Sequence, residues 1–154
     1  MSTKRYVRHQ VLPLPLSQTF EFFSDARNLE RITPAFLRFE IVGAPPNPLV
    51  AGSIIDYTLR LHGIKVHWRT RITKMDPPHA FEDTQDRGPY RVWRHTHTFR
   101  ALTPATTLVS DDVEYALPAG VLGSLVAGRK VLRDLDRIFA YRAKTIATLL
   151  AATN

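Results

Sequence analysis

The chain of 154 residues has no cysteine, which excludes disulfide bonds and leaves any metal site without a thiolate ligand. Its first fifteen residues, MSTKRYVRHQVLPLP, contain no continuous apolar segment of the kind that a secretory signal needs. No later stretch approaches the roughly 18 apolar residues that cross a membrane. We therefore predict a cytoplasmic protein without integral membrane association.

Signatures of common catalytic and nucleotide-binding sites are also missing. The sequence has no nucleophile elbow, phosphate-binding loop or flavin motif, so no motif identifies a reaction. Lysine and arginine outnumber aspartate and glutamate by 21 to 14, and the net charge is +7. Because the basic residues are dispersed and form no block, we predict that the chain binds no nucleic acid.

The length and the patterns that are present predict one domain over residues 1–154. Residues 5–12 alternate as a first strand, and two short helical segments follow at residues 17–23 and 25–32. Breaks rich in proline and glycine separate the later strands, which we predict at residues 39–42, 53–62, 64–74, 80–85, 91–101 and 107–117.

The longest apolar pattern lies at the end of the chain, from about Val121 to Ala152. Apolar residues recur there at spacings of three and four, which is typical of an amphipathic helix. Most strand connections are of hairpin length, so sequential strands should pair antiparallel. We predict an α+β fold in which a curved antiparallel sheet of six to seven strands wraps around the long helix and leaves room for a cavity.

This order of elements resembles the helix-grip fold of the START-like, or SRPBCC, superfamily, which includes polyketide cyclases, lipid-transfer domains and the birch-pollen allergen group. The segments that carry the resemblance are FFSDARNLERITP (22–34), IDYTLRLHGIKVHWRTRI (55–72), FEDTQDRGPYRVWRHTHTF (81–99), DDVEYALPAGVLG (111–123) and IFAYR (138–142). They are most similar to a bacterial subfamily of small single-domain ligand-binding proteins. The resemblance implies a hydrophobic cavity without metal or cofactor, and it names no substrate, because the superfamily holds both carriers and enzymes.

The segment RVWRHTHTFR at residues 91–100 alternates strictly between two kinds of side chain. Trp93, His95, His97 and Phe99 share one face of the predicted strand, while arginines and threonines share the other. A strand that turns imidazoles and aromatic rings inward is typical of one wall of a mixed apolar and polar cavity.

Counting outward from the turn at residues 102–105 places His97 opposite Asp111 on the next strand. The same counting through the turn at residues 86–90 places Asp83 opposite Trp93. A carboxylate beside an imidazole fixes its tautomer and raises its pKa, which suits a general base or the binding of an anionic group. His97 and Asp111 are therefore our candidate catalytic residues.

Three interpretations of this pair stay open: a buried pair that fixes strand register, a contact to a ligand, and an acid–base pair. His95 and His97 also have the spacing of two metal ligands on one strand face, with Asp111 or Asp83 as a third. Because alternate histidines occur in many strands and the resemblance implies no metal, we predict no metal and no cofactor.

On the long helix, Arg137 and Tyr141 are four residues apart and share a face that we expect to look toward the mouth of the cavity. An arginine there could hold a carboxylate or phosphate, and a surface ion pair with Asp134 is the alternative. The complete set of predicted ligand contacts is Tyr57, Trp68, Asp83, Gln85, Trp93, His95, His97, Phe99, Asp111, Tyr115, Arg137 and Tyr141.

Three hypotheses about function follow. In the first, a monomer or homodimer binds a small hydrophobic or amphipathic molecule, whose polar end contacts His97, Asp111 and Gln85. In the second, a cyclase or dehydratase uses His97 as base, Asp111 to orient it and a tyrosine as proton donor. In the third, an outward arginine face docks a partner or a membrane surface. That face comprises Arg60, Arg69, Arg71, Arg94 and Arg100.

Overall fold

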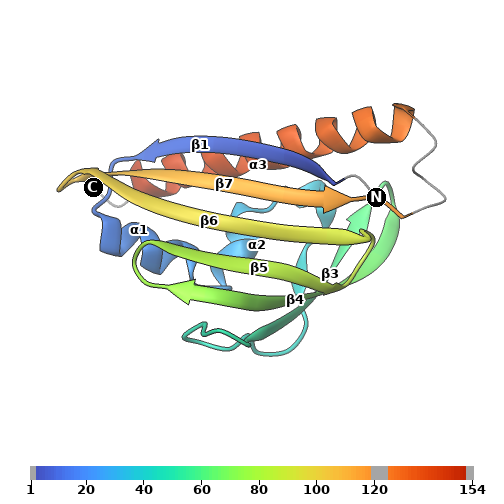
Figure 1. The fold of residues 1–154 in the computed structure, drawn as a ribbon, viewed down its shortest axis with the longest axis horizontal. Coiled ribbons are helices and arrows are strands. Elements are labelled where there is room, and N and C mark those ends of the chain that lie inside the picture. The colour runs from blue at the N-terminus through green and yellow to red at the C-terminus, as the bar shows by residue number, and fades with distance from the viewer. Residues whose placement is uncertain (1–2, 119–124, 152–154) are drawn as a thin grey trace.

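The sheet is the largest element of the computed structural model, which describes residues 3–118 and 125–151. Its strands are β1 (Lys4–Leu12), β2 (Glu40–Ile41), β3 (Ile54–Leu61), β4 (Ile64–Asp76), β5 (Ala80–Arg87), β6 (Val92–Thr103) and β7 (Thr106–Ala116). All neighbours are antiparallel, and the spatial order is β1-β7-β6-β5-β4-β3-β2. The meander predicted from hairpin-length connections is therefore confirmed, with β1 added beside β7 (Figure 1).

Within residues 3–118 and 125–151, four helical segments accompany the sheet: α1 (Leu16–Phe23), α2 (Asn28–Ile32), a 3-10 turn (Ala35–Leu37) and α3 (Leu125–Ala151). The second helix begins three residues later than we predicted. Its first residues form a turn instead, because the Asp25 carboxylate accepts a hydrogen bond from the backbone N–H of Arg27 at 3.0 Å. Of the predicted long helix, residues 121–124 and 152 lie outside the described residues.

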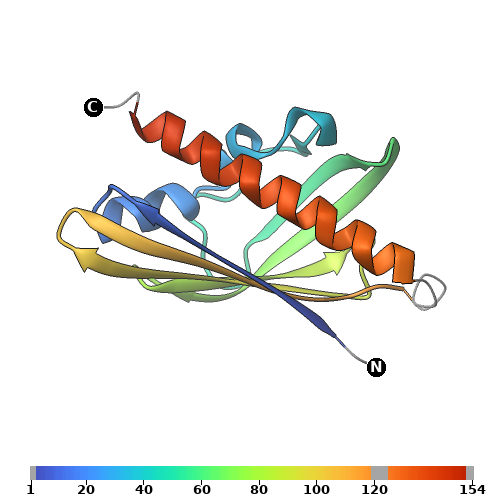
Figure 2. The same ribbon diagram turned by 90° about the horizontal axis from the view of Figure 1, so that it is seen from above.

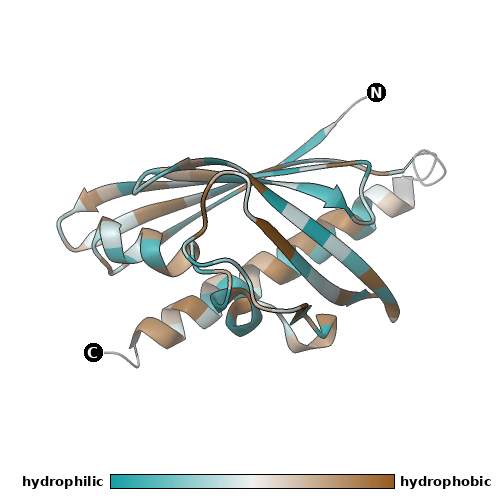
Figure 3. Cartoon of the chain, turned by 90° about the horizontal axis from the view of Figure 1, so that it is seen from below, coloured by the Kyte–Doolittle hydropathy of each residue, from teal (hydrophilic) through white to brown (hydrophobic). Residues whose placement is uncertain are grey.

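Helix α3 crosses one face of the curved sheet diagonally, and α1 and α2 lie on the same side (Figure 2). Polar and apolar segments alternate along α3 (Figure 3). Leu135, Phe139 and Ile146 are buried at spacings of four and seven, so the apolar stripe of the helix faces inward as its periodicity predicts. Sheet and helix thus form the two layers of the helix-grip fold.

The β3–β4 hairpin extends from the sheet toward α3 (Figure 2). Leu61 pairs with Ile64, so the loop has only two residues, His62 and Gly63, with φ angles of 49° and 83°. Two positive φ angles are what a tight turn needs to match the twist of its strands, and glycine adopts them without strain. The tip is tied to α3, because His62 Nε2 lies 2.8 Å from Asp134 Oδ2.

The strand registers decide which inward side chains meet. Between β6 and β7, His97 lies opposite Asp111 and Trp93 opposite Tyr115, which confirms the register predicted from the sequence. Between β5 and β6 the prediction is wrong by two residues, because Asp83 lies opposite His95 and not opposite Trp93.

The β5–β6 turn explains this shift. Gln85 bridges the loop, since its Nε2 donates to the carbonyl of Tyr90 at 2.7 Å and its Oε1 accepts from the Tyr90 N–H at 3.2 Å. Strand β5 continues to Arg87, so the turn is centred later than the count assumed. Because side chains in a strand alternate with a period of two, a shift of two residues keeps every side chain on its predicted face.

Candidate functional site

A cavity of about 160 Å³ lies between the sheet, α2 and α3. Such a volume suits a small molecule, since a cavity of about 150 Å³ lined by apolar side chains can hold a benzene ring. Most of the lining is aliphatic or aromatic. The aromatic members are Phe22, Phe23, Phe39, Tyr57, Trp68, Phe81, Tyr90, Trp93 and Phe139, and the polar ones are Asp25, Asn28, Thr33, Thr70, Asp83, His95, His97 and Arg142.

One wall of the cavity is a continuous group of aromatic rings. Trp68 on β4 stacks on Tyr57 of β3, with ring centroids 5.9 Å apart, and meets Trp93 of β6 edge to face at 5.2 Å. Tyr90 packs against Trp93 at 4.8 Å. Tyr57 and Trp68 are register partners on β3 and β4, so strand pairing brings these two together. Trp93 reaches Trp68 across β5, and Tyr90 packs on Trp93 from the β5–β6 turn.

A cluster of four polar residues, which we call the His–Asp cluster, joins this wall. It consists of Asp83 on β5, His95 and His97 on β6, and Asp111 on β7. The centroids of the two imidazole rings lie 3.7 Å apart, and the ring planes are tilted by 32°. All four side chains are at most 15% exposed, so their polar atoms depend on one another for partners.

Each histidine has its closest contact with a different carboxylate. His97 Nε2 lies 2.8 Å from Asp83 Oδ2, and His95 Nε2 lies 2.8 Å from Asp111 Oδ1. His97 Nδ1 is 3.3 Å from the same Asp111 oxygen but does not have hydrogen-bond geometry. Asp111 therefore hydrogen-bonds to His95, although it lies opposite His97 in the register as we predicted.

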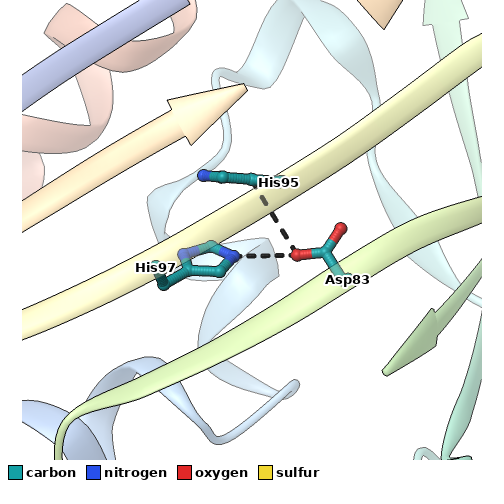
Figure 4. Close-up of side chains that lie close together, drawn as sticks. All are labelled: Asp83, His95 and His97. Atoms are coloured by element: carbon teal, nitrogen blue, oxygen red, sulfur yellow. Dashed lines mark hydrogen bonds and ion pairs between the residues drawn. The ribbon is translucent and has the colours of Figure 1, made fainter. Parts of the chain in front are cut away.

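Asp83, His95 and His97 point toward one another at one end of the cluster (Figure 4). His95 Nδ1 lies 3.9 Å from the Asp83 oxygen that His97 contacts. Each of the three residues offers one atom able to bind a metal ion, and these atoms all lie within 4.8 Å of one another. All three residues also line the cavity, whereas Asp111 lies behind the histidines, outside the lining.

The cluster separates the pKa values of its two histidines. Burial lowers the pKa of His95, and the adjacent His97 ring acts in the same direction. Burial also acts to lower the pKa of His97, but contacts with Asp111 and Asp83 outweigh it, so this pKa is raised. The cluster therefore holds a proton on His97 in preference to His95.

Asp111 contributes much of the stabilisation of the charged His97 ring. Burial by itself would raise the pKa of its carboxyl group, but its contacts with His95 and His97 reverse the effect and hold the pKa well below its usual range. An anion beside two adjacent imidazoles, one charged more readily than the other, can orient a general acid and a general base in the same site.

Three buried side-chain nitrogens of lining residues have no hydrogen-bond partner in the part of the chain that the structure describes. One is His97 Nδ1, described above, and the other two are donors, the indole Nε1 of Trp68 and the Nε of Arg142. The Arg142 guanidinium lies 5.0 Å from the centre of the Phe139 ring, and its charge acts on the Tyr57 hydroxyl. A buried donor without a partner costs free energy, so a ligand with an acceptor atom would be favoured here.

Of the twelve predicted contacts, six line the cavity: Tyr57, Trp68, Asp83, Trp93, His95 and His97. The structure does not place the other six in the lining. Gln85 is held in the β5–β6 turn, and Phe99 packs against Phe20 and Phe23 in the core. Asp111 lies behind the histidines.

The remaining three predicted contacts also lie away from the cavity. Tyr115 is fully buried against Val113, and its side chain is not part of the lining. Arg137 stacks over Phe36, with its guanidinium carbon 4.5 Å from the ring centre, and does not pair with Asp134 as the alternative supposed. Tyr141 is 41% exposed.

Arg142 and Tyr90 are two of the polar or aromatic lining residues that the predicted set did not contain; the others are Phe22, Phe23, Asp25, Asn28, Thr33, Phe39, Thr70, Phe81 and Phe139. Arg142 follows Leu135 and Phe139 at spacings of seven and three, so it belongs to the buried stripe of α3. That periodicity was the available signal, and it favours position 142 over positions 137 and 141. Tyr90 lies in a turn, where alternation gives no orientation.

The outward face of the sheet carries the arginines that we considered for docking. Most of them pair with acidic side chains on the same face, and Arg60 donates to the Gly63 carbonyl at 2.9 Å. This pairing leaves little unbalanced charge for a partner. The pairs are Arg69–Asp56, Arg71–Asp86 and Arg94–Glu114.

Comparisons with known proteins agree with this architecture. Residues 12–141 match the protein family described as polyketide cyclase / dehydrase and lipid transport. No curated protein sequence matches the chain. Among the described residues, none of the helices is long and apolar enough to span a membrane.

Several solved structures share the fold at low sequence identity. The protein TTHA0849 from Thermus thermophilus is 18% identical, with a TM-score of 0.75 over 98% of this chain and 100% of that one. The Zhui aromatase/cyclase from a Streptomyces species is 16% identical, with a TM-score of 0.73 over 96% and 93%. Norcoclaurine synthase from Thalictrum flavum, in complex with dopamine and hydroxybenzaldehyde, is 15% identical, with a TM-score of 0.70 over 99% and 89%. These likenesses confirm the fold that we predicted.

Proposed function

Because the chain belongs to the polyketide cyclase / dehydrase and lipid transport family, we propose that its cavity binds a small, largely hydrophobic molecule that carries a hydrogen-bond acceptor. The observation that carries this proposal is a mostly apolar cavity of about 160 Å³, with aromatic rings along one wall and two buried donors, on Trp68 and Arg142, that lack partners among the described residues. Pockets of this kind bind ligands through apolar contact and orient them through a few polar groups.

The lining favours an aromatic ligand over a flexible chain. Tyr57, Trp68 and Trp93 offer ring faces and edges at 5 to 6 Å from one another, the spacing that aromatic pairs prefer. The guanidinium of Arg142 favours a carboxylate or phenolate as the acceptor, because a charged acceptor makes the stronger hydrogen bond. Two of the structurally similar proteins, an aromatase/cyclase and a synthase bound to dopamine and hydroxybenzaldehyde, support an aromatic molecule in this fold.

Tryptophan fluorescence tests this proposal directly, because both tryptophans of the chain line the cavity. We expect 4-nitrobenzoate and its uncharged counterpart nitrobenzene to quench the emission saturably. In the Arg142→Met variant, the affinity for 4-nitrobenzoate should fall about 10-fold or more, because a charged hydrogen bond is lost. The affinity for nitrobenzene should change little.

The matched control is Arg133→Met, which removes an exposed arginine from the same helix. It should leave both affinities unchanged. Linear quenching without saturation by both compounds would overturn the proposal of a binding cavity. Equal weakening of both compounds in the Arg142 variant would retain the cavity and overturn the acceptor site.

A second candidate function, a dehydratase or cyclase, is favoured by the opposite pKa directions of His95 and His97 in the cavity wall. In a dehydration, the neutral imidazole of His95 would take a proton from the carbon next to a carbonyl. The charged His97 would give a proton to the leaving hydroxyl, which departs as water. This assigns the base role to His95, whereas the sequence pointed to His97.

The β-hydroxy ketone 4-hydroxy-4-phenylbutan-2-one is a suitable probe, because its dehydration product absorbs in the near ultraviolet. We expect turnover by the wild type and a loss of about 100-fold or more in His97→Gln, the usual contribution of a positioned acid or base. His67→Gln, an exposed histidine on β4, is the control and should retain turnover. Conversion no faster than in buffer would exclude this reaction and leave ligand binding as the function.

A further inference from the structure

We propose that Asp83, His95 and His97 form a binding site for a divalent transition-metal ion of the Zn²⁺ class, open to the cavity. The sequence led us to expect no metal, because alternate histidines on a strand are a weak signal. The structure adds three observations that the sequence did not contain: the position of Asp83, the second carboxylate behind the histidines, and the exposure of all three ligands to one cavity.

Two of the three distances between the ligand atoms are close to those of a tetrahedral site, and the third is at most 4.8 Å. With metal–ligand bonds of about 2.0 to 2.1 Å, two ligands of a tetrahedral ion lie about 3.3 Å apart. Asp83 Oδ2 lies 2.8 Å from His97 Nε2 and 3.9 Å from His95 Nδ1. Each of these separations differs from the tetrahedral value by about 0.5 to 0.6 Å. Small side-chain rotations would accommodate an ion.

Asp111 lies where a carboxylate would orient histidines that bind a metal ion. Metal-binding histidines commonly donate the N–H of the other ring nitrogen to a carboxylate, which fixes the tautomer and the ring orientation. His95 Nε2 lies 2.8 Å from Asp111 Oδ1, and His97 Nδ1 lies 3.3 Å from the same oxygen. Asp111 therefore orients the His95 ring through a hydrogen bond and lies close enough to His97 Nδ1 to accept a second one after a small rotation.

The charge of the His–Asp cluster also suits a divalent cation. Its two carboxylates, Asp83 and Asp111, are only 15% and 12% exposed, so water screens little of their attraction for a cation bound beside the histidines. The charge of a divalent ion bound by two neutral imidazoles balances the combined charge of the Asp83 and Asp111 carboxylates.

The chemistry of the ligands indicates the class of ion. Imidazole nitrogen suits Zn²⁺, Fe²⁺, Ni²⁺ and Cu²⁺, whereas Mg²⁺ and Ca²⁺ prefer sites made of oxygen ligands alone. Three protein ligands leave a tetrahedral ion with one free position, and here the three ligands all border the cavity. This is the arrangement of sites at which a water molecule or substrate oxygen completes the coordination.

The test titrates untagged protein, stripped with EDTA, with ZnCl₂ in a calorimeter, and measures bound zinc by elemental analysis after gel filtration. We expect one equivalent to bind. Co²⁺ should bind in the same stoichiometry, with the visible absorption of a four- or five-coordinate ion. This absorption distinguishes the site from surface carboxylates, on which octahedral Co²⁺ absorbs only weakly.

Three variants test the ligand assignment. Asp111→Asn should weaken zinc binding about 10- to 100-fold, the usual effect of losing an outer-shell partner. Asp83→Asn and His97→Gln should weaken it more. The matched control is Asp112→Asn, which removes the neighbouring carboxylate from the outer face of β7, and it should leave the affinity unchanged. Far-ultraviolet circular dichroism verifies that each variant folds. If His97→Gln does not fold, the isosteric change Asp83→Asn tests the ligand assignment instead.

Failure to bind one equivalent of Zn²⁺, or binding that Asp83→Asn leaves unaltered, would overturn the proposal. The second result would place the ion at a surface histidine. The metal site does not depend on the proposed ligand, because quenching by 4-nitrobenzoate is measured on stripped protein. Loss of one function would therefore leave the other testable.

Discussion

Asp111 and Asp112 are consecutive on β7, yet they lie on opposite faces of the sheet. The Asp111 side chain is 12% exposed and contacts the two adjacent histidines. The Asp112 side chain is 34% exposed and accepts a hydrogen bond from Nε of Arg5 on β1 at 2.8 Å. Both faces carry acid–base pairs between neighbouring strands, and the difference is the surrounding solvent.

On the outer face, water and salt screen each pair, so its contribution to stability is small. On the inner face, the groups lose their hydration and must be satisfied by one another. The outer face uses arginine, which keeps its charge at every accessible pH, whereas the inner face uses histidine, which can exchange protons near neutrality. The same pairing scheme therefore gives a fixed surface on one side and a chemically responsive cluster on the other.

The largest expected effect comes from removing the inner carboxylate. Asp111→Ala should lower the free energy of unfolding by about 3 to 5 kcal/mol, because it leaves buried histidines without their counter-charge. Asp112→Ala should lower it much less, since its pair is exposed. Urea denaturation near neutral pH measures both. Equal losses in the two variants would contradict the distinction between the two faces.

The pH dependence of the two histidines should have opposite signs. The folded pKa of His97 is raised above its unfolded value of about 6.5, so its stabilising contribution is complete below that pH and is lost as the pH rises through the folded pKa. The difference in unfolding free energy between wild type and His97→Gln should therefore shrink as the pH rises.

For His95 the folded pKa is lowered, so its contribution is present above about pH 6.5 and is lost as the pH falls through the folded pKa. The difference between wild type and His95→Gln should grow as the pH rises toward that value. Urea midpoints from about pH 5 to pH 9 give both slopes. Slopes of the same sign would show that the protons are shared differently from our assignment.

A smaller effect is expected from the turn that sets the inner register. A Cβ at Gly88 would lie 2.4 Å from Oε1 of Gln85, so Gly88→Ala should displace the amide that bridges to Tyr90. We expect a loss of about 1 to 2 kcal/mol in unfolding free energy, the cost of disturbing part-buried hydrogen bonds. In a Gln85→Ala background the same change should cost little, and an undiminished cost there would place the clash elsewhere.

The smallest effect belongs to the outer face. Arg94→Gln breaks the exposed pair with Glu114, and the unfolding free energy should not change measurably at physiological salt. A small loss should be visible only at low ionic strength, where screening is weak. A loss that persists at high salt would mean that this pair behaves like the inner ones.

The inward-facing and outward-facing side chains of the strands could be predicted from sequence, because side chains alternate between the two faces along a strand. The register of β6 on β7 was also predictable, since a short turn joins them. The register of β5 on β6 was not, because a side-chain bridge from Gln85 to Tyr90 fixes that turn. The alternation of side chains still predicted the correct face for Asp83, but only the structure showed that its partner across the strands is His95.

The helix shows a different limit of sequence reasoning. Its periodicity identified an apolar stripe, and the spacing from Leu135 and Phe139 favours position 142, but packing also decides how far a polar residue at the border of the stripe turns inward. We chose Arg137 and Tyr141, and the structure instead places Arg142 in the cavity lining. The direction of a long side chain at the border of a stripe depends on neighbours from distant segments.

The contact between His62 and Asp134 has a kinetic consequence. It joins the tip of the β3–β4 hairpin to α3 at 2.8 Å, one residue beyond Leu61 and one before Leu135, both of which line the cavity. A molecule that passes between these two walls must wait for the hairpin to separate from the helix. Its residence time is then governed by the opening rate of the protein, so uptake and release would both be slow even for a ligand of modest affinity.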